Sequence, residues 1–174
     1  MFVNLTEVLL NEGRTVTMQI EPELAQVTVG GETYPVSGRA AVTLTITNVG
    51  KGKAEVRGEG RIVFRARCGR CLKDVEETLE LVIDRTVYAP DRMPSPEDGD
   101  DQEYMNGYQM DVEELLRNEI VINWPMKILC RPDCRGICRQ CGQDLNTGTC
   151  DCDTFVPDPR MAVIKDIFNG SKEV

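Results

Sequence analysis

The amino-acid sequence predicts an α+β protein, in which a twisted antiparallel β-sheet carries short helices and a cysteine-rich C-terminal segment. Three observations predict this class. Apolar and polar residues alternate from about residue 14 to residue 88, helical apolar stripes lie outside that stretch, and eight cysteines gather in two clusters. The 174 residues are 41% hydrophobic and 28% charged, a globular composition that allows one real core.

The chain opens with a stretch that favours a short helix over residues 2 to 11. Leu9 and Leu10 supply apolar side chains for packing, and Gly13 follows as a residue type that commonly ends a helix. From about residue 14 the helical spacing gives way to strand alternation. The sheet is therefore expected to begin there.

The strands are predicted by a period of two. Val42, Leu44 and Ile46 alternate with threonines, and similar alternation runs through residues 61–67 and 79–84. Glycines between the runs are expected to form turns or bulges. These runs predict about five or six antiparallel strands with one buried face.

A CxxC motif, Cys68-Gly-Arg-Cys71, stands between the last two runs and is expected at the tip of a β-hairpin. Such a turn aims both sulfurs and the nearby backbone amides at one point, which is the geometry of a zinc knuckle. The motif resembles a redox CxxC only in spacing, because it lies at no helix N-terminus that would activate a thiolate.

Residues 90 to 109 are predicted to be a linker, because they are broken by prolines and acidic. The acids up to Glu103 are Asp91, Glu97, Asp98, Asp100, Asp101 and Glu103. This linker should be mobile in the free protein. It divides the chain into a β-rich domain at 1–89 and a C-terminal part at 110–174, which is expected to pack on the β-rich domain.

Two helices are predicted in the C-terminal part. Asp111 with Glu114 forms a capping box for the first helix, and Pro125 ends it. The second begins at Asp158 and Pro159 and ends at Gly170. The cysteine-rich segment lies between them.

Composition excludes several classes of protein. With 20 basic and 29 acidic residues the net charge is −9, so a uniformly basic nucleic-acid-binding surface is excluded. The chain has no histidine, which removes Ser-His, Cys-His and His-metal chemistry. No apolar run approaches the roughly 20 residues of a membrane span, and the N-terminus lacks the positive start of a signal peptide. We therefore expect a cytoplasmic, non-enzymatic protein with no membrane and no small-molecule substrate.

The cysteines predict metal binding. They are Cys68, Cys71, Cys130, Cys134, Cys138, Cys141, Cys150 and Cys152. In a reducing compartment, closely spaced cysteines are more often metal ligands than disulfides. Structural zinc sites are tetrahedral and take four thiolates, so eight thiolates predict two zinc ions. An iron–sulfur cluster also takes four thiolates and stays an alternative.

The eight ligands can be divided in two ways. In the first, Cys138, Cys141, Cys150 and Cys152 form one site, and Cys68, Cys71, Cys130 and Cys134 form a second site that ties the β-rich domain to the C-terminal segment. In the second, the two CxxC pairs share one metal. We favour the first division, because residues 138 to 152 close a short loop at little entropic cost.

The basic residues gather near the cysteines. Residues 51–73 contain eight basic residues against two acids, a net charge of +6. A functional interpretation makes Lys53, Arg57, Arg61 and Arg65 contacts to RNA phosphates. A structural interpretation makes the charges near the cysteines offset the metal centres, since zinc with four thiolates is formally −2.

The order of these motifs resembles the YceD family of small bacterial and plastid proteins. The resemblance covers nearly the whole chain. In order, its motifs are Asn4-Leu5, Cys68-Gly-Arg-Cys71-Leu-Lys, Trp124-Pro125-Met126-Lys127, Leu129-Cys130-Arg-Pro-Asp-Cys134-Arg-Gly-Ile-Cys138-Arg-Gln-Cys141-Gly, Cys150-Asp-Cys152 and Asp158-Pro-Arg. It implies a part in the accumulation of large-subunit ribosomal RNA. Some members lack much of the later cysteine cluster, which implies a separate site for the hairpin pair.

The sequence and the resemblance together predict a non-enzymatic zinc-binding factor in large-subunit ribosomal RNA accumulation and ribosome biogenesis. Its partner would be ribosomal RNA or a large-subunit ribosomal protein. One alternative is a protein–protein adaptor whose acidic linker captures a basic ribosomal protein. Another is a thiol-based redox or zinc sensor.

Overall fold

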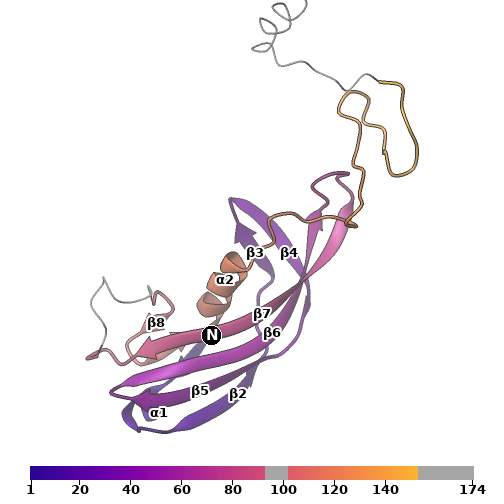
Figure 1. Cartoon of the computed structure of the whole chain (residues 1–174). Coiled ribbons are helices and arrows are strands. Elements are labelled where there is room, and N and C mark those ends of the chain that lie inside the picture. Colours follow the sequence, from indigo (N-terminus) through magenta and orange to yellow (C-terminus); the bar gives the residue numbers. More distant parts are fainter. Residues whose placement is uncertain (93–101, 153–174) are drawn as a thin grey trace, which may run out of the picture. The chain divides into compact units, whose positions relative to one another are not determined.

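The computed structural model describes residues 1–92 and 102–152 (Figure 1). Residues 93–101 of the expected linker, and all of the helix expected from Asp158 to Gly170, lie outside these residues. The chain forms two compact units. The first contains residues 1–67 and 74–128, and the second contains residues 68–73 together with the chain from residue 129 onward. Each unit is described by itself.

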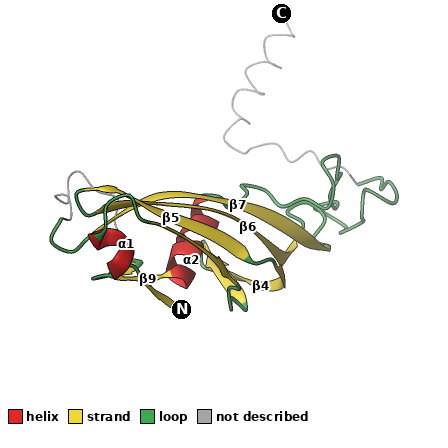
Figure 2. Cartoon of the chain, turned by 90° about the horizontal axis from the view of Figure 1, so that it is seen from below, coloured by secondary structure: helices red, strands yellow, loops and turns green. Residues whose placement is uncertain are grey.

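The first unit is mostly antiparallel sheet. Its elements are β1 (Phe2–Asn4), α1 (Thr6–Leu10), β2 (Thr15–Ile20), β3 (Gln26–Val29), β4 (Glu32–Arg39), β5 (Val42–Gly50), β6 (Lys53–Arg67), β7 (Asp74–Tyr88), β8 (Met105–Asn106), β9 (Gln109–Asp111) and α2 (Val112–Ile122). Strands β2 to β7 form a six-stranded sheet, and β1, β9 and β8 form a small one. The two helices lie on one face of the larger sheet (Figure 2). This arrangement is compatible with the predicted α+β class.

Strand β6 is the centre of the large sheet. It pairs along its whole length with β7, from Lys53 opposite Tyr88 to Arg67 opposite Asp74. Its other edge is shared by β5 and β4, which pair with successive parts of the strand. The runs predicted over 61–67 and 79–84 are thus parts of two long strands, and the predicted hairpin between them is confirmed.

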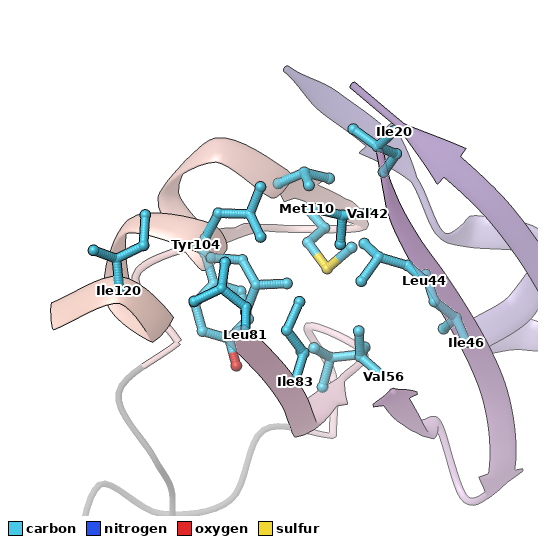
Figure 3. Packing of buried hydrophobic residues seen from close by; sticks show 14 of the residues in the cluster. Ile20, Val42, Leu44, Ile46, Val56, Leu81, Ile83, Tyr104, Met110 and Ile120 are labelled. Carbon is cyan, nitrogen blue, oxygen red and sulfur yellow. The ribbon is translucent and has the colours of Figure 1, made fainter. Parts of the chain in front are cut away.

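The core lies between the large sheet and the helices. Inward residues of β5 to β7, such as Leu44, Val56 and Ile83, pack with Ile120 of α2 and with Tyr104 (Figure 3). At the far end of the strands, Phe64 stacks on Trp124 with ring centroids 4.3 Å apart. The alternation read from the sequence therefore does identify the buried face.

Glycine at position 58 allows β5 and β6 to approach each other. A Cβ atom there would lie 2.5 Å from Leu44 Cδ2 and 2.7 Å from the carbonyl oxygen of Thr43. Because that oxygen belongs to a paired backbone, the strand would have to shift. We expect Gly58→Ala to destabilise the protein by about 1–3 kcal/mol in urea unfolding.

The control Val82→Ala, at a side chain that is 66% exposed, should change stability by less than about 0.5 kcal/mol. Equal stability of Gly58→Ala and wild type would contradict the close approach.

The N-terminal segment differs from the predicted helix over residues 2 to 11. Phe2–Asn4 form β1, which pairs with β9 from Phe2 opposite Asp111 to Asn4 opposite Gln109, and only Thr6–Leu10 are helical. The sequence pattern missed this strand because its partner lies about a hundred residues away, and local spacing carries no sign of such a pairing.

Residues 102–109 of the expected linker belong to the fold. The side chain of Gln102 donates to the carbonyl oxygen of Thr86 at 3.1 Å and accepts from the amide of Tyr88 at 3.4 Å, so it occupies the end of the β7 edge. Tyr104 is buried, and β8 and β9 follow. The acidic stretch used to predict the linker ends at Glu103, so Gln102 lies within it, and Tyr104, β8 and β9 follow it.

The predicted helix after Asp111 is confirmed. The Asp111 side chain accepts from the amide of Glu113 at 3.1 Å, which satisfies one of the free donors at the start of α2. The buried carboxylate of Glu119 is paired with Arg85 of β7. The helix therefore belongs to the unit that contains the sheet, whereas the sequence grouped it with the cysteine-rich segment. None of the helices in the described residues is long and apolar enough to cross a membrane.

Candidate metal centres

The second unit brings the eight cysteines together as two groups of four. We call Cys68, Cys71, Cys130 and Cys134 the first centre, and Cys138, Cys141, Cys150 and Cys152 the second centre. Within each centre the sulfur atoms lie within 4.8 Å of one another, so each group could hold a metal ion. This grouping is the first of the two divisions considered from the sequence.

The sulfur spacing fits a single tetrahedral ion. In the first centre, Cys68 Sγ lies 3.8 Å from Cys134 Sγ, and Cys71 Sγ lies 3.6 Å from Cys130 Sγ. Four thiolates bound at about 2.3 Å from a tetrahedral zinc ion are spaced by about 3.8 Å. All eight cysteines are free thiols, and these distances are far from the roughly 2.05 Å of a disulfide.

The two CxxC motifs form the same turn. The amide of Cys68 donates to the carbonyl oxygen of Lys73 at 2.8 Å, and the amide of Leu72 donates back to Cys68 at 3.0 Å. The second centre repeats both bonds from Cys138, to Gln143 at 2.8 Å and from Gly142 at 2.9 Å. In each turn the residue after the second cysteine has a positive φ, 62° at Leu72 and 74° at Gly142. The sequence showed the shared spacing, and the structure adds a shared backbone conformation.

These turns direct backbone amides at the sulfurs, as expected for knuckles. Burial by itself would raise the pKa of Cys68, but the amides of Cys130, Cys71 and Arg70 donate to its sulfur and lower the pKa to about 6. The amides of Cys141 and Gln140, with the Cys150 thiol, lower the pKa of Cys138 to about 6 as well. At least one sulfur in each centre is therefore stabilised as a thiolate.

Cys130 of the first centre and Cys152 of the second show why these centres favour a cation. Burial, together with hydrogen bonds that the Cys130 thiol donates to the sulfurs of Cys134, Cys71 and Cys68, raises the pKa of Cys130 to about 12. A hydrogen bond with Cys141 and burial raise the pKa of Cys152 to about 12. Several negative charges cannot share such a small volume without a counter-charge, so a bound metal cation would be needed to deprotonate all four thiols.

Polar residues outside the cysteines hold the first centre in place. Arg70 Nη1 donates to the carbonyl oxygen of Cys134 at 2.7 Å, and the amide of Ile137 donates to the carbonyl oxygen of Arg70 at 3.1 Å. Lys73 Nζ lies 2.6 Å from Asp144 Oδ2, and this ion pair lowers the pKa of Asp144 to about 2. Sequence reasoning missed Asp144, because no spacing rule connects it to the hairpin.

The four basic residues expected to contact RNA lie on β6, in the other unit. Arg57 pairs with Glu55 at 3.0 Å and lies 3.8 Å from Asp84, while Arg61 and Arg65 pair with acids of β7. Those acids are Glu80, at 3.0 Å from Arg61, and Glu76, at 3.1 Å from Arg65. Lys53 lies over the Tyr88 ring, 6.0 Å from its centroid.

The net positive charge counted along residues 51–73 is therefore offset across the hairpin. Apart from Glu55, the offsetting acids belong to β7 and follow the CxxC motif in sequence, so a count that stopped at residue 73 left them out. Exposed pairs of this kind contribute only about 0–1 kcal/mol each, but they reduce the field that an incoming phosphate would meet.

The fold and these centres define a class of protein: an antiparallel sheet whose longest hairpin ends in a CxxC turn that is completed by a cysteine-rich segment. The pattern of the family described as "Large ribosomal RNA subunit accumulation protein YceD" matches residues 56–168. The chain belongs to the YceD family.

Its curated relatives carry little further information. Uncharacterized proteins of Mycobacterium bovis and Mycobacterium tuberculosis are 28% identical over 79 residues. The matched stretch covers 45% of this chain and only 38% of each relative. No solved structure matches the chain.

Proposed function

We propose that this protein is a non-enzymatic, zinc-binding factor that acts in the accumulation of large-subunit ribosomal RNA. Its membership of the YceD family supports the biological role. The two groups of four sulfurs, spaced as around one tetrahedral ion, support the zinc. The metal would cross-link its four ligands, and the chain contributes the turns that aim sulfurs and amides at the ion.

The compactness of the centres favours a single ion over an iron–sulfur cluster. A cluster places several irons and inorganic sulfides between the cysteine ligands, so its cysteine sulfurs lie farther apart than those around one ion. The sulfurs of each centre lie within 4.8 Å of one another. This spacing supports zinc, the ion that structural four-cysteine sites most often hold.

The partner would be ribosomal RNA or a large-subunit ribosomal protein. A phosphate-contacting role for Lys53, Arg57, Arg61 and Arg65 stays a prediction, and the acidic partners of the three arginines are its main counterargument. The same ion pairs favour the second candidate function, an adaptor that contacts a ribosomal protein, because a nearly neutral hairpin face attracts RNA weakly.

RNA binding can be tested by removing either the basic residues of β6 or the acids of β7 that pair with them. If the arginines contact phosphates, changing all four basic residues to Ala should flatten the dependence of affinity on salt by about one unit of slope per lost contact. Removing acids by Glu76→Gln with Glu80→Gln should strengthen binding, because it leaves Arg61 and Arg65 unpaired. Affinity for large-subunit ribosomal RNA fragments, measured at several salt concentrations, provides both results.

Zinc content serves as the control in this titration, because none of the changed residues is a ligand and all variants should keep their metal. Identical salt dependence for wild type, the basic-to-Ala variant and the acid-to-Gln variant would exclude RNA contact by this face. The adaptor would then be tested with purified large-subunit ribosomal proteins and with a variant that neutralises the acids of residues 91–103.

A further inference from the structure

We propose that the two centres bind their metal ions cooperatively, and that Asn146 is the positioning residue that couples them. This inference rests on the proposed zinc binding. In sequence, Asn146 belongs to the second centre, because residues 142–149 connect Cys141 to Cys150. Its side chain nevertheless contacts the first centre.

Both ends of the Asn146 amide are used at the first centre. Nδ2 lies 3.5 Å from Cys134 Sγ, within reach of an N–H···S hydrogen bond. Oδ1 accepts from the backbone amide of Arg135 at 2.8 Å and from Arg131 Nη2 at 2.9 Å. One side chain thus contacts a ligand sulfur, the backbone that follows it and the side chain of Arg131 that precedes it.

Asn146 is itself held by the loop and by the hairpin. Asp144 Oδ1 accepts from the Asn146 backbone amide at 2.9 Å and from Nδ2 at 2.7 Å. The other carboxylate oxygen of Asp144 lies 2.6 Å from Nζ of Lys73, two residues after Cys71 of the first centre. The chain of contacts therefore runs from the hairpin through Asp144 and Asn146 to Cys134.

The backbone of the same loop also reaches the segment between the two centres. The amide of Leu145 donates to the carbonyl oxygen of Gly136 at 2.9 Å, and Asp144 forms an isolated antiparallel bridge with Ile137. Gly136 has φ 80°, and a Cβ there would lie 2.9 Å from the carbonyl oxygen of Arg70. The loop, the connecting segment and the hairpin thus pack against one another at this point.

Cooperativity follows from how the loop is closed. An ion at the second centre fixes Cys141 and Cys150, which lie on either side of residues 142–149, and so reduces the conformational freedom of the loop. The entropy of ordering Asn146 is then already lost when the first centre binds its ion. Because linkage is reciprocal, the first ion strengthens binding of the second by the same factor.

Neighbours of metal ligands that orient them typically contribute about 10-fold to 100-fold to metal affinity. We therefore expect Asn146→Ala to weaken zinc binding at the first centre by about 10-fold to 100-fold. Gln143→Ala is the matched control, because Gln143 lies in the same loop and is exposed. The control should bind both ions as wild type does.

The experiment uses the full chain, stripped of metal and titrated with zinc against a chromophoric chelator, and with cobalt to follow thiolate coordination. Cys141→Ser with Cys150→Ser leaves the first centre alone, and Cys71→Ser reports on the second centre. We expect the first centre to bind about 10-fold to 100-fold more weakly without the second. Asn146→Ala added to the Cys141/Cys150 variant should cause little further loss, because both changes remove the same contact.

Three results would overturn the coupling. Asn146→Ala could bind zinc with wild-type affinity, or the first centre could keep its affinity when the second centre is removed. The third is that the affinity losses of Asn146→Ala and of the Cys141/Cys150 variant add in full when the changes are combined. In each of these, wild-type protein still takes up two ions and the proposed zinc function stands. Failure of wild-type protein to bind zinc or cobalt would overturn both. Unchanged zinc binding at the second centre when Asn146→Ala is added to Cys71→Ser, where the first centre cannot contribute, would show that the substitution leaves the loop folded.

Discussion

Protein purified without added metal is expected to contain about two zinc ions per chain, and Cys138→Ser is expected to contain about one. The reason is that each centre has four sulfurs and no spare ligand among the described cysteines, so the loss of one thiolate opens a closed site. Structural zinc sites contribute about 10–16 kcal/mol of apparent binding free energy. Loss of an ion should therefore unfold the loop that it closes.

Elemental analysis and alkylation of native protein measure this result. In Cys138→Ser, the cysteines of the second centre should become reactive, while those of the first stay less reactive than in metal-free protein. In Cys71→Ser, the remaining cysteines of the first centre should become reactive while those of the second stay less reactive. The hairpin tip should also lose its attachment to the segment after residue 129. Wild-type protein with metal content near zero and eight alkylatable thiols would overturn the zinc proposal.

The largest effect in the sheet unit is expected from Phe64→Ala, at about 3–5 kcal/mol of lost stability. Phe64 is fully buried, stacks on Trp124 at 4.3 Å and meets Tyr34 edge-on at 6.0 Å. The substitution removes this aromatic contact and leaves a cavity at the inner face of β6.

Urea unfolding followed by Trp124 fluorescence measures the loss, since the only tryptophan lies at the site of the change. Phe2→Ala removes the same ring where it is 63% exposed, and should cost less than about 1 kcal/mol. Zinc content should be unchanged in both variants, because neither residue lies in the unit that holds the cysteines. An equal loss of unfolding free energy in the two variants would show that burial of Phe64 does not stabilise the protein as the structure indicates.

Much of the fold could be predicted from the sequence, because its strands are strongly periodic. Val42, Leu44 and Ile46 are fully buried, and the alternating threonines face outward as expected. The CxxC motif lies between β6 and β7, and Asp111 caps α2. These features depend on neighbours in sequence, so a local pattern is enough to identify them.

The errors have a common physical origin in contacts between distant residues. β1 exists because Phe2–Asn4 pair with β9. Tyr104 is buried although it follows an acidic stretch. The arginines of β6 meet their acids only after β7 has folded back on β6. Composition and periodicity contain no information about which distant segments meet.

The sequence by itself determined the chemistry of the candidate sites: eight thiols, their spacing, two CxxC turns and the resemblance to the YceD family. The sequence allowed two ways of dividing the cysteines between the centres, because spacing along the chain restricts which ligands can meet but does not select one set. Only the tertiary structure brought Cys130 and Cys134 to the hairpin, and placed Asn146 of one centre against a ligand of the other. The reason is that a metal site depends on distances of a few ångströms between side chains, and for ligands some sixty residues apart those distances are set by how the whole chain folds.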